Sequence, residues 1–375
     1  MSRFLDNLLS LLAVVIALTS GTVLAQQKKQ TPPTRLFDAP GAPSFSRLDD
    51  KSGPNPPLDV SGNFVIGPDY QPASELDPVE GVPQGKVEQF TIDSRQTKLF
   101  NPGIARNEFG TVDPNNPRTL IVDTHPIDYE RKITVYIPSQ YEPGTEAPFM
   151  VIHDGPKGKP NMMIPRILDN LIHQKRVPAM IAIFVANGGG DAQGHERGKE
   201  YDTMSGAYAE YIETEVLPRI QENYGVRLTP DPDGRAAMGS SSGGSAALAM
   251  AWYRTDLYHR VLTTSGTFVN QQWPFNPATP GGAWDFHETI IPNSPEKPLR
   301  IFLAVGDRDN LNPNVMRDGM HDWVEANHRM AKVLKTKGYE YQYLFCQNSG
   351  HGVRNAKEQF LPHAIEWVWF GYKAK

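Results

Sequence analysis

Short, uninterrupted apolar runs alternate with helix-like segments along most of this chain, and this alternation restricts the possible folds more than any other feature. The apolar runs lie at residues 149–152, 179–186, 235–238, 261–264, 299–305 and 341–346. The helix-like segments lie at residues 164–174, 208–223, 244–252, 322–337 and 360–369. A strand that is apolar on both faces needs cover on both faces, as the central strands of a parallel sheet have. The sequence therefore predicts an α/β fold with a mostly parallel central sheet and helices on both of its faces.

The first 25 residues have the pattern of a signal peptide. Arg3 supplies a positive charge, residues 8–18 are almost entirely apolar, and residues 23–25 offer small or apolar side chains for cleavage. The apolar stretch of about 11 residues is shorter than the roughly 20 that a membrane-spanning helix needs. Cleavage after Ala25 predicts a secreted or periplasmic protein with no membrane contact apart from export. Retention of residues 1–25 as an N-terminal anchor is the alternative.

Residues 26–85 differ in composition from the rest of the chain, because they are rich in proline and glycine. Proline removes a backbone donor and fixes φ, so we expect a linker or a wrapping segment without regular elements. After this segment, residues 87–92 and 131–138 alternate apolar and polar side chains, as half-buried strands do. We therefore place a single α/β domain at residues 86–375.

Charge and cysteine content narrow the class of protein further. The formal net charge is −5 and no run of basic residues is longer than Lys28-Lys29, so we expect no nucleic-acid partner. Cys346 is the only cysteine, so the chain forms no internal disulfide and its core must be stable without one. Since Cys346 ends an apolar run, it is expected to be a buried strand residue rather than a nucleophile.

Residues 238–244, Met-Gly-Ser-Ser-Ser-Gly-Gly, fit the pattern G-x-S-x-G around Ser241. An apolar strand precedes the motif and a helix of small residues follows it, which is the context in which such a serine acts as a nucleophile. The amides and the dipole at the helix N-terminus then face the oxyanion that develops during attack. A Ser/Gly-rich connection without chemistry is the alternative, and only the middle serine lies at the apex of the turn.

A serine nucleophile needs a base and an acid that orients the base. His351 lies between two glycines directly after the strand at 341–346, where its ring can reach over the edge of the sheet. Asp307 and Asp309 both follow the strand at 299–305, and a bend at Gly306 favours Asp309, although Asp307 stays possible. The order Ser241, Asp309, His351 is that of the α/β-hydrolase fold.

The tetrahedral oxyanion must be held by two backbone N–H groups. Ser242, the residue after the nucleophile, is expected to supply one of them. The loop after the strand at 149–152 is expected to supply the other, from Gly155, because Pro156 has no N–H. An ordinary turn at Asp154-Gly155 is an equally good interpretation of this loop.

Three further residues are candidates for contact with the substrate. His153 ends the strand at 149–152, close to the expected site. Arg197 could bind an anionic or hydroxyl-bearing substrate, although an i, i+3 ion pair with Glu200 is the simpler interpretation. Trp273 lies in the segment between the strands at 261–264 and 299–305, and its ring could stack on a phenolic or sugar ring or belong to the local core.

His321, Asp322 and His328 are residue types that can bind a metal ion. The spacing places both histidines on one helix face, but no cysteine or cluster of carboxylates completes a ligand set. We therefore expect neither a metal nor an organic cofactor.

Several short blocks of the sequence resemble one esterase family of the α/β-hydrolase fold. The resemblance is carried by residues 151–155, 168–172, 197–202, 239–244 with 251–252, 306–309, 350–351, 361–362 and 367–369. This family includes the enterochelin (ferric siderophore) esterases and the feruloyl and acetyl-xylan esterases. The resemblance extends from about residue 85 to residue 372, and it implies that Ser241, Asp309 and His351 are nucleophile, acid and base. It also favours Asp309 over Asp307.

The resemblance implies hydrolysis of a small-molecule or glycan ester, of siderophore type or from a plant polysaccharide or phenolic. Enterochelin esterases that work in the cytoplasm carry an additional N-terminal β domain, for which residues 26–85 are too short and too rich in proline. The family also contains acyltransferases, so an acyltransferase with the same three residues is the nearest alternative. A non-catalytic binding protein on a hydrolase scaffold is another, and the presence of all three residues argues against it.

Overall fold

A ten-stranded sheet forms the centre of the computed structural model, which describes residues 42–48, 53–311 and 318–373. In spatial order its strands are β1 (Ser46–Arg47), β2 (Gly62–Ile66), β16 (Glu340–Gly350), β15 (Arg300–Arg308), β14 (Arg260–Thr264), β13 (Arg235–Ser240), β10 (Phe149–His153), β11 (Ile181–Val185), β8 (Glu130–Ile137) and β3 (Lys86–Asp93). Neighbouring strands are parallel from β1 to β11, whereas β8 is antiparallel to both β11 and β3. The predicted mostly parallel sheet is confirmed.

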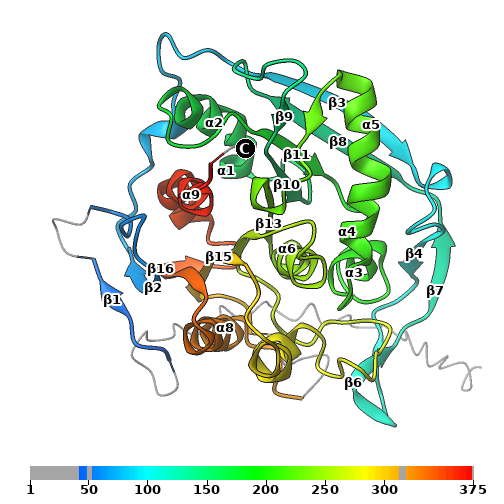
Figure 1. Ribbon diagram of the computed structural model, residues 1–375. Coiled ribbons are helices and arrows are strands. Elements are labelled where there is room, and N and C mark those ends of the chain that lie inside the picture. The colour runs from blue at the N-terminus through cyan, green and yellow to red at the C-terminus, as the bar shows by residue number, and fades with distance from the viewer. Residues whose placement is uncertain (1–41, 49–52, 312–317, 374–375) are drawn as a thin grey trace, which may run out of the picture. The chain divides into compact units, whose positions relative to one another are not determined.

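Helices cover both faces of this sheet (Figure 1). One face packs against α2 (Ile164–His173) and α9 (Arg354–Trp369), with the short α1 (Lys159–Met162) beside them. The other face packs against α3 (Glu196–Tyr201), α4 (Ala207–Tyr211), α5 (Leu217–Tyr224), α6 (Ser242–Tyr253), α7 (Ile291–Asn293) and α8 (Trp323–Lys337). Along β10, Met150 and Ile152 pack on the face covered by α2 and α9, whereas Val151 packs on the opposite face. Successive side chains of a strand point to opposite faces, which is why these runs are apolar throughout.

Smaller elements extend from this framework. Two antiparallel pairs, β4 (Gly103–Arg106) with β7 (Thr124–Ile127) and β5 (Thr111–Asp113) with β6 (Asn116–Ile121), lie in the connection from β3 to β8. A parallel pair joins β9 (Glu146–Ala147) to β12 (Arg227–Leu228). The 3-10 helices are Ser74–Leu76, Ser94–Gln96, Pro232–Gly234 and Gly282–Trp284, and π-helical turns occur at Ile212–Val216 and Phe286–Ile290.

The expectation that residues 26–85 lack regular elements is wrong for the part of this segment that the structure describes. β2 is a full member of the central sheet, where Phe64 pairs with Leu344 of β16. The side-chain amide of Gln342 donates to the carbonyls of Pro57 and Val60 at 2.7 and 2.8 Å, which anchors the segment that leads into β2. The prolines lie on either side of the strand rather than within it, so they do not interrupt its ladder.

The predicted signal peptide, residues 1–25, lies outside the described residues. Within the described ranges, no helix combines the length and the apolar character required to cross a bilayer. Cys346 is buried in β16, as predicted. Because β10, β11, β13, β14, β15 and β16 are parallel, their carboxyl ends meet at one edge of the sheet, where ligands bind in open α/β sheets.

Candidate active site

Ser241 occupies a strained turn between β13 and α6. Its backbone has φ 58° and ψ −131°, a conformation that a residue with a side chain rarely adopts. Gly239 and Gly243 allow the turn to close, since a Cβ atom on Gly239 would lie 2.1 Å from the carbonyl oxygen of Gly243. The Ser241 amide donates to the Thr264 carbonyl at 3.0 Å, which fixes the turn against β14. The predicted strand-to-helix turn is thus present, with Ser241 at its apex.

The structure brings His351 and Asp309 together with Ser241. Nε2 of His351 lies 2.9 Å from Oγ of Ser241, and Nδ1 lies 2.6 Å from Oδ1 of Asp309. Asp309 is fully buried, whereas the side chain of His351 remains 31% exposed. Trp323, the first residue of α8, stands perpendicular to the imidazole at 6.0 Å between ring centroids and limits its movement. These contacts form a continuous chain from a buried carboxylate to an accessible hydroxyl.

The two candidate acids have different environments. Asp309 contacts His351 and also accepts a hydrogen bond from the Asn310 amide at 2.7 Å. Asp307 instead accepts from the amides of Asn348 and Ser349, at 2.9 and 3.0 Å. Asp307 therefore holds the end of β16, from which the loop with His351 begins, and Asp309 is the aspartate in contact with the histidine.

Sequence reasoning missed Ser265, which follows β14. Its hydroxyl donates to Oδ2 of Asp309 and accepts a hydrogen bond from the Gly352 amide at 2.8 Å. Ser265 has φ 50°, a second strained conformation close to Ser241. Its position directly after an apolar strand, at the same edge as the other site residues, is a signal that could have identified it.

Sequence reasoning also missed Thr267, which lies beside the Ser241 hydroxyl. Its Oγ1 is 3.4 Å from Oγ of Ser241, and it accepts a hydrogen bond from Nε1 of Trp323 at 3.2 Å. The Thr267 amide donates to the Ser241 carbonyl at 3.1 Å. Thr267 therefore connects the turn at Ser241 to the tryptophan that packs on His351.

The two predicted oxyanion donors differ in availability. Ser242 begins α6, and the first amides of a helix have no acceptor within the helix. Gly155 donates its N–H to the Val185 carbonyl at 3.1 Å, because the chain after β10 continues beside β11. The preceding amide, that of Asp154, donates to the hydroxyl of Tyr201 at 3.1 Å. The geometry therefore does not support Gly155 as the second donor.

Arg197 forms an ion pair with Asp154, not with Glu200. Its Nε and Nη2 atoms contact the two carboxylate oxygens of Asp154 at 2.8 and 2.9 Å, and Nη1 contacts Asp191. Burial raises the pKa of Asp154, but the hydrogen bonds from Arg197 outweigh it and keep that pKa below its ordinary value. The charge of Arg197 is compensated by two carboxylates, which leaves little capacity for an anionic substrate.

Glu200 has a different partner, the fully buried Arg131 of β8. Glu200 also accepts the Gly188 amide at 3.1 Å, so it ties the loop after β11 to β8. The predicted i, i+3 pair between Arg197 and Glu200 is therefore wrong, because each side chain reaches a partner on another element.

His153 lies in the core rather than in contact with solvent. It is 2% exposed, its Nε2 is 3.2 Å from the sulfur of Met250, and its ring meets that of Tyr201 edge-on at 5.2 Å. Burial lowers the pKa of His153 to about 4, so the ring is neutral at pH 7. Its predicted role as a substrate contact is not supported, because the side chain points beneath α6.

Trp273 is half-buried, and its Nε1 donates to the Leu120 carbonyl of β6 at 3.2 Å. Nearby, the side-chain amide of Asn270 donates to the Arg118 carbonyl at 3.1 Å. The segment after β14 is thus fastened to the hairpin of β5 and β6, with part of the Trp273 ring accessible beside it.

The residues considered for a metal have protein partners instead. Nδ1 of His321 contacts Asp318 at 3.0 Å, and Nδ1 of His328 contacts the hydroxyl of Tyr343 at 2.8 Å. Within residues 42–48, 53–311 and 318–373, no group of three or more His, Cys, Asp or Glu side chains is arranged to hold a metal ion.

The sequence matches the model of one protein family. Residues 124–366 match the family described as "Putative esterase", which is more than half of the chain. Among curated proteins, none matches the sequence.

Solved structures that resemble this chain include three esterases. The enterobactin esterase from Shigella flexneri is 19% identical with a TM-score of 0.47, covering 64% of this chain and 55% of its own. A feruloyl esterase module from Clostridium thermocellum is 16% identical with a TM-score of 0.48, covering 84% and 97%. A ferulic acid esterase from Anaeromyces mucronatus is 14% identical with a TM-score of 0.49, covering 80% and 95%. This chain therefore spans about half the length of the enterobactin esterase. The fold described above is given by the order and direction of its own strands.

Proposed function

This chain belongs to the "Putative esterase" family of carboxylic ester hydrolases, and from that premise we propose that it is an exported serine esterase working through Ser241, His351 and Asp309. The observation that carries this proposal is the chain of hydrogen bonds from Asp309 through His351 to Ser241, at 2.6 and 2.9 Å. A hydroxyl at the apex of a strained turn, in contact with a histidine that a buried carboxylate orients, is the arrangement of an activated nucleophile.

In the first half of the reaction, Oγ of Ser241 attacks the ester carbonyl carbon while Nε2 of His351 takes the hydroxyl proton. Asp309 holds Nδ1–H of His351 and stabilises the imidazolium that forms. The oxyanion accepts a hydrogen bond from the Ser242 amide at the N-terminus of α6. The carbon–oxygen bond to the alcohol then breaks, and the alcohol leaves with the proton from His351. The product of this half is an acyl group on Ser241.

In the second half, water takes the place of the alcohol. His351 removes a proton from the water as it attacks the acyl carbonyl, and the Ser242 amide holds the second oxyanion. Collapse of the intermediate returns the proton to Oγ of Ser241 and releases the carboxylic acid. Every proton in both halves moves through His351, and the chemistry requires no metal or organic cofactor.

We propose as substrate an ester of siderophore type or one from a plant phenolic or polysaccharide. The sequence blocks shared with that esterase family support this class. Trp273 lies in the segment after β14, and its ring is half-buried. The accessible part of this ring offers a face on which a phenolic or sugar ring can stack. The pattern of residues 1–25 supports export, which would place the enzyme where such esters are met.

A hydrolysis panel tests the proposal. Purified residues 26–375 would be assayed against 4-nitrophenyl acetate and butyrate, methyl ferulate, acetylated xylan and ferric enterochelin, each beside Ser241→Ala. We expect turnover of at least one ester by the wild type, and a loss of kcat on the order of 10⁴ or more in the variant. Equal rates in both proteins would remove Ser241 from the mechanism. Adding acceptor alcohols separates the acyltransferase alternative, because a transferase would yield a new ester in place of the free acid.

A further inference from the structure

A buried carboxyl group lies beside the nucleophile turn and takes no part in the chain of Ser241, His351 and Asp309. Asp202 directly follows α3 and is 3% exposed. Its Oδ2 atom accepts a hydrogen bond from the Ser242 hydroxyl at 3.2 Å and another from the Gln271 side-chain amide at 3.3 Å. Among the described residues, its Oδ1 atom has no hydrogen-bond partner. A buried carboxyl oxygen without a hydrogen-bond partner lowers the stability of the fold, and such groups are often found where they serve a function.

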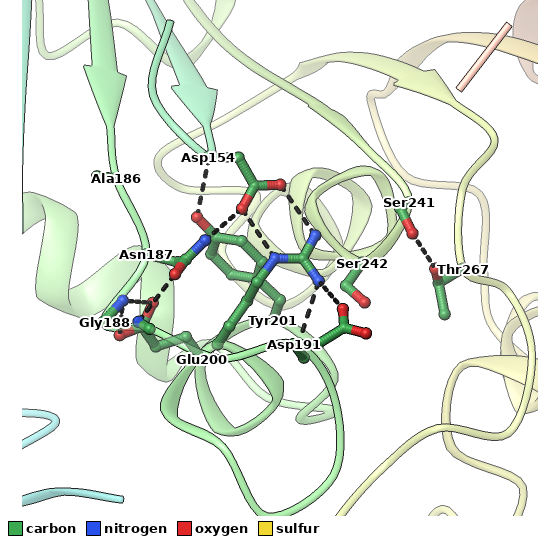
Figure 2. A network of polar contacts seen from close by, with 12 residues as sticks. Asp154, Ala186, Asn187, Gly188, Asp191, Glu200, Tyr201, Ser241, Ser242 and Thr267 are labelled. Atoms are coloured by element: carbon green, nitrogen blue, oxygen red, sulfur yellow. Dashed lines mark hydrogen bonds and ion pairs between the residues drawn. The ribbon is translucent and has the colours of Figure 1, made fainter. Parts of the chain in front are cut away.

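The three side chains come from three different segments that meet at this edge of the sheet. Asp202 follows α3, Ser242 begins α6 and Gln271 lies in the loop after β14. Nε2 of Gln271 also lies 3.4 Å from the Ser242 hydroxyl, so that hydroxyl accepts from Gln271 and donates to Asp202. In Figure 2, Ser242 lies between Ser241 and the charged cluster that contains Asp154 and Asp191. The start of α6 is therefore held through a side chain as well as through its backbone.

We propose that Asp202 is a positioning residue for ester hydrolysis. Through the Ser242 hydroxyl it holds the Ser242 amide in the direction required to donate to the oxyanion, and its neutral form supports the reaction better than its ionised form. This inference rests on the proposed function, because it needs an oxyanion next to Ser242.

The preference for the neutral form follows from the distance between two negative charges. Oδ2 of Asp202 is 3.2 Å from the Ser242 hydroxyl, and the amide of the same residue binds the oxyanion. An ionised Asp202 would therefore stand within several ångströms of the charge that develops in the transition state. At the effective dielectric constant of about 20 that is typical of protein sites, such a repulsion slows a reaction about tenfold or more.

Both forms of Asp202 are present near neutral pH. Burial raises the pKa of Asp202 to about 7. The charge of Arg197 lowers this pKa and the charge of Asp191 raises it, and both effects are smaller than that of burial. Arg197 is itself paired with Asp154 after β10. From α6 and the loop after β14, the groups that contact Asp202 are Ser242 and Gln271, and neither carries a charge.

Two variants at this position separate the contact from the charge. In Asp202→Asn, the amide oxygen keeps both accepted hydrogen bonds and the side chain never ionises. The ratio of kcat/KM in Asp202→Asn to that in the wild type should therefore rise about five- to tenfold between pH 6 and pH 8, as the wild-type carboxyl loses its proton. In Asp202→Ala, both contacts are lost, so kcat at pH 6, where the wild-type carboxyl is mostly protonated, should fall about tenfold with little change in KM. Asp128→Asn is the matched control, since that aspartate is 62% exposed and lies before β8.

The outcomes distinguish this inference from the proposed function. A pH-independent ratio for Asp202→Asn, together with wild-type kcat in Asp202→Ala, would overturn the positioning role while hydrolysis through Ser241 stands. If Asp202→Ala does not fold, the pH ratio of Asp202→Asn decides alone. Retention of full activity by Ser241→Ala, assayed beside these variants, would instead reject the proposed function and the positioning role together. Fluorophosphonate labelling of Ser241 corrects the rates of the wild type and of the Asp202 variants for the fraction of competent enzyme.

Discussion

Ser265 and Asp309 are joined by a hydrogen bond from the serine hydroxyl to Oδ2 of the carboxylate. The same hydroxyl accepts the amide of Gly352, the residue after His351, at 2.8 Å. One small side chain after β14 thus connects the carboxylate after β15 with the loop after β16. The relative position of Asp309 and His351 therefore depends on the side chain of Ser265.

Replacing Ser265 by alanine should lower kcat about tenfold and leave KM nearly unchanged. The variant removes one donor to Asp309 and leaves the Gly352 amide without its acceptor, so His351 is held less firmly. Steady-state kinetics on an activated ester measures the effect, with the exposed Ser139→Ala as a control. A rise in KM at constant kcat would place Ser265 in substrate binding instead.

Asp309 and Asp307 should respond differently to the same substitution. In Asp309→Asn, kcat should fall by on the order of 10⁴, because the amide no longer orients His351 in the required tautomer. In Asp307→Asn, we expect a smaller loss of kcat and a loss of about 1–3 kcal/mol in the free energy of unfolding, because two backbone amides at the end of β16 lose their carboxylate. Kinetics and urea denaturation of both variants test this, and a larger kinetic defect in Asp307→Asn would reverse the assignment.

The ion pair between Arg131 and Glu200 is fully buried, so breaking it should be costly. Glu200→Gln leaves the guanidinium without its counter-charge and should lower the free energy of unfolding by about 3–5 kcal/mol. Glu146→Gln provides the comparison, since its partner Arg227 is 61% exposed and such pairs contribute about 0–1 kcal/mol. Urea denaturation measures both. Equal effects of the two substitutions would mean that the buried pair is not formed.

Phe64 tests whether the proline-rich segment belongs to the folded core. Its side chain is 5% exposed within β2, so Phe64→Ala should cost about 3–5 kcal/mol of unfolding free energy. Val60→Ala, at a residue that is 40% exposed, should change stability by less than about 0.5 kcal/mol. If residues 53–66 were only a linker, both variants would unfold at the wild-type denaturant concentration.

The sheet and the three residues at its edge could be predicted from the sequence because they depend on local patterns. Each apolar run from 149–152 to 341–346 forms a central strand, and in a parallel sheet the residues after such strands meet at one edge. Ser241, Asp309 and His351 each follow such a strand, so their proximity follows from topology alone. The shared edge also places Ser265 there, and its position after the strand at 261–264 is the same signal.

The contacts of Arg197 and Gly155 could not be predicted because they depend on pairing between distant segments. The partner of Arg197 is Asp154, 43 residues away, whereas sequence reasoning considered only the nearby Glu200. The Gly155 amide is occupied because β11 runs beside it, which depends on strand order. His153 shares the face of Val151, two residues earlier, so the alternation along β10 would have placed it in the core.

Mapping the covalent adduct identifies the nucleophile among three consecutive serines, Ser240, Ser241 and Ser242. The enzyme would be labelled with a fluorophosphonate, digested and sequenced by tandem mass spectrometry, with Ser241→Ala and His351→Ala treated in parallel. We expect one adduct per chain on Ser241, no adduct in Ser241→Ala, and labelling slowed by several orders of magnitude in His351→Ala. An adduct on Ser240 or Ser242, or unchanged labelling without His351, would contradict this expectation.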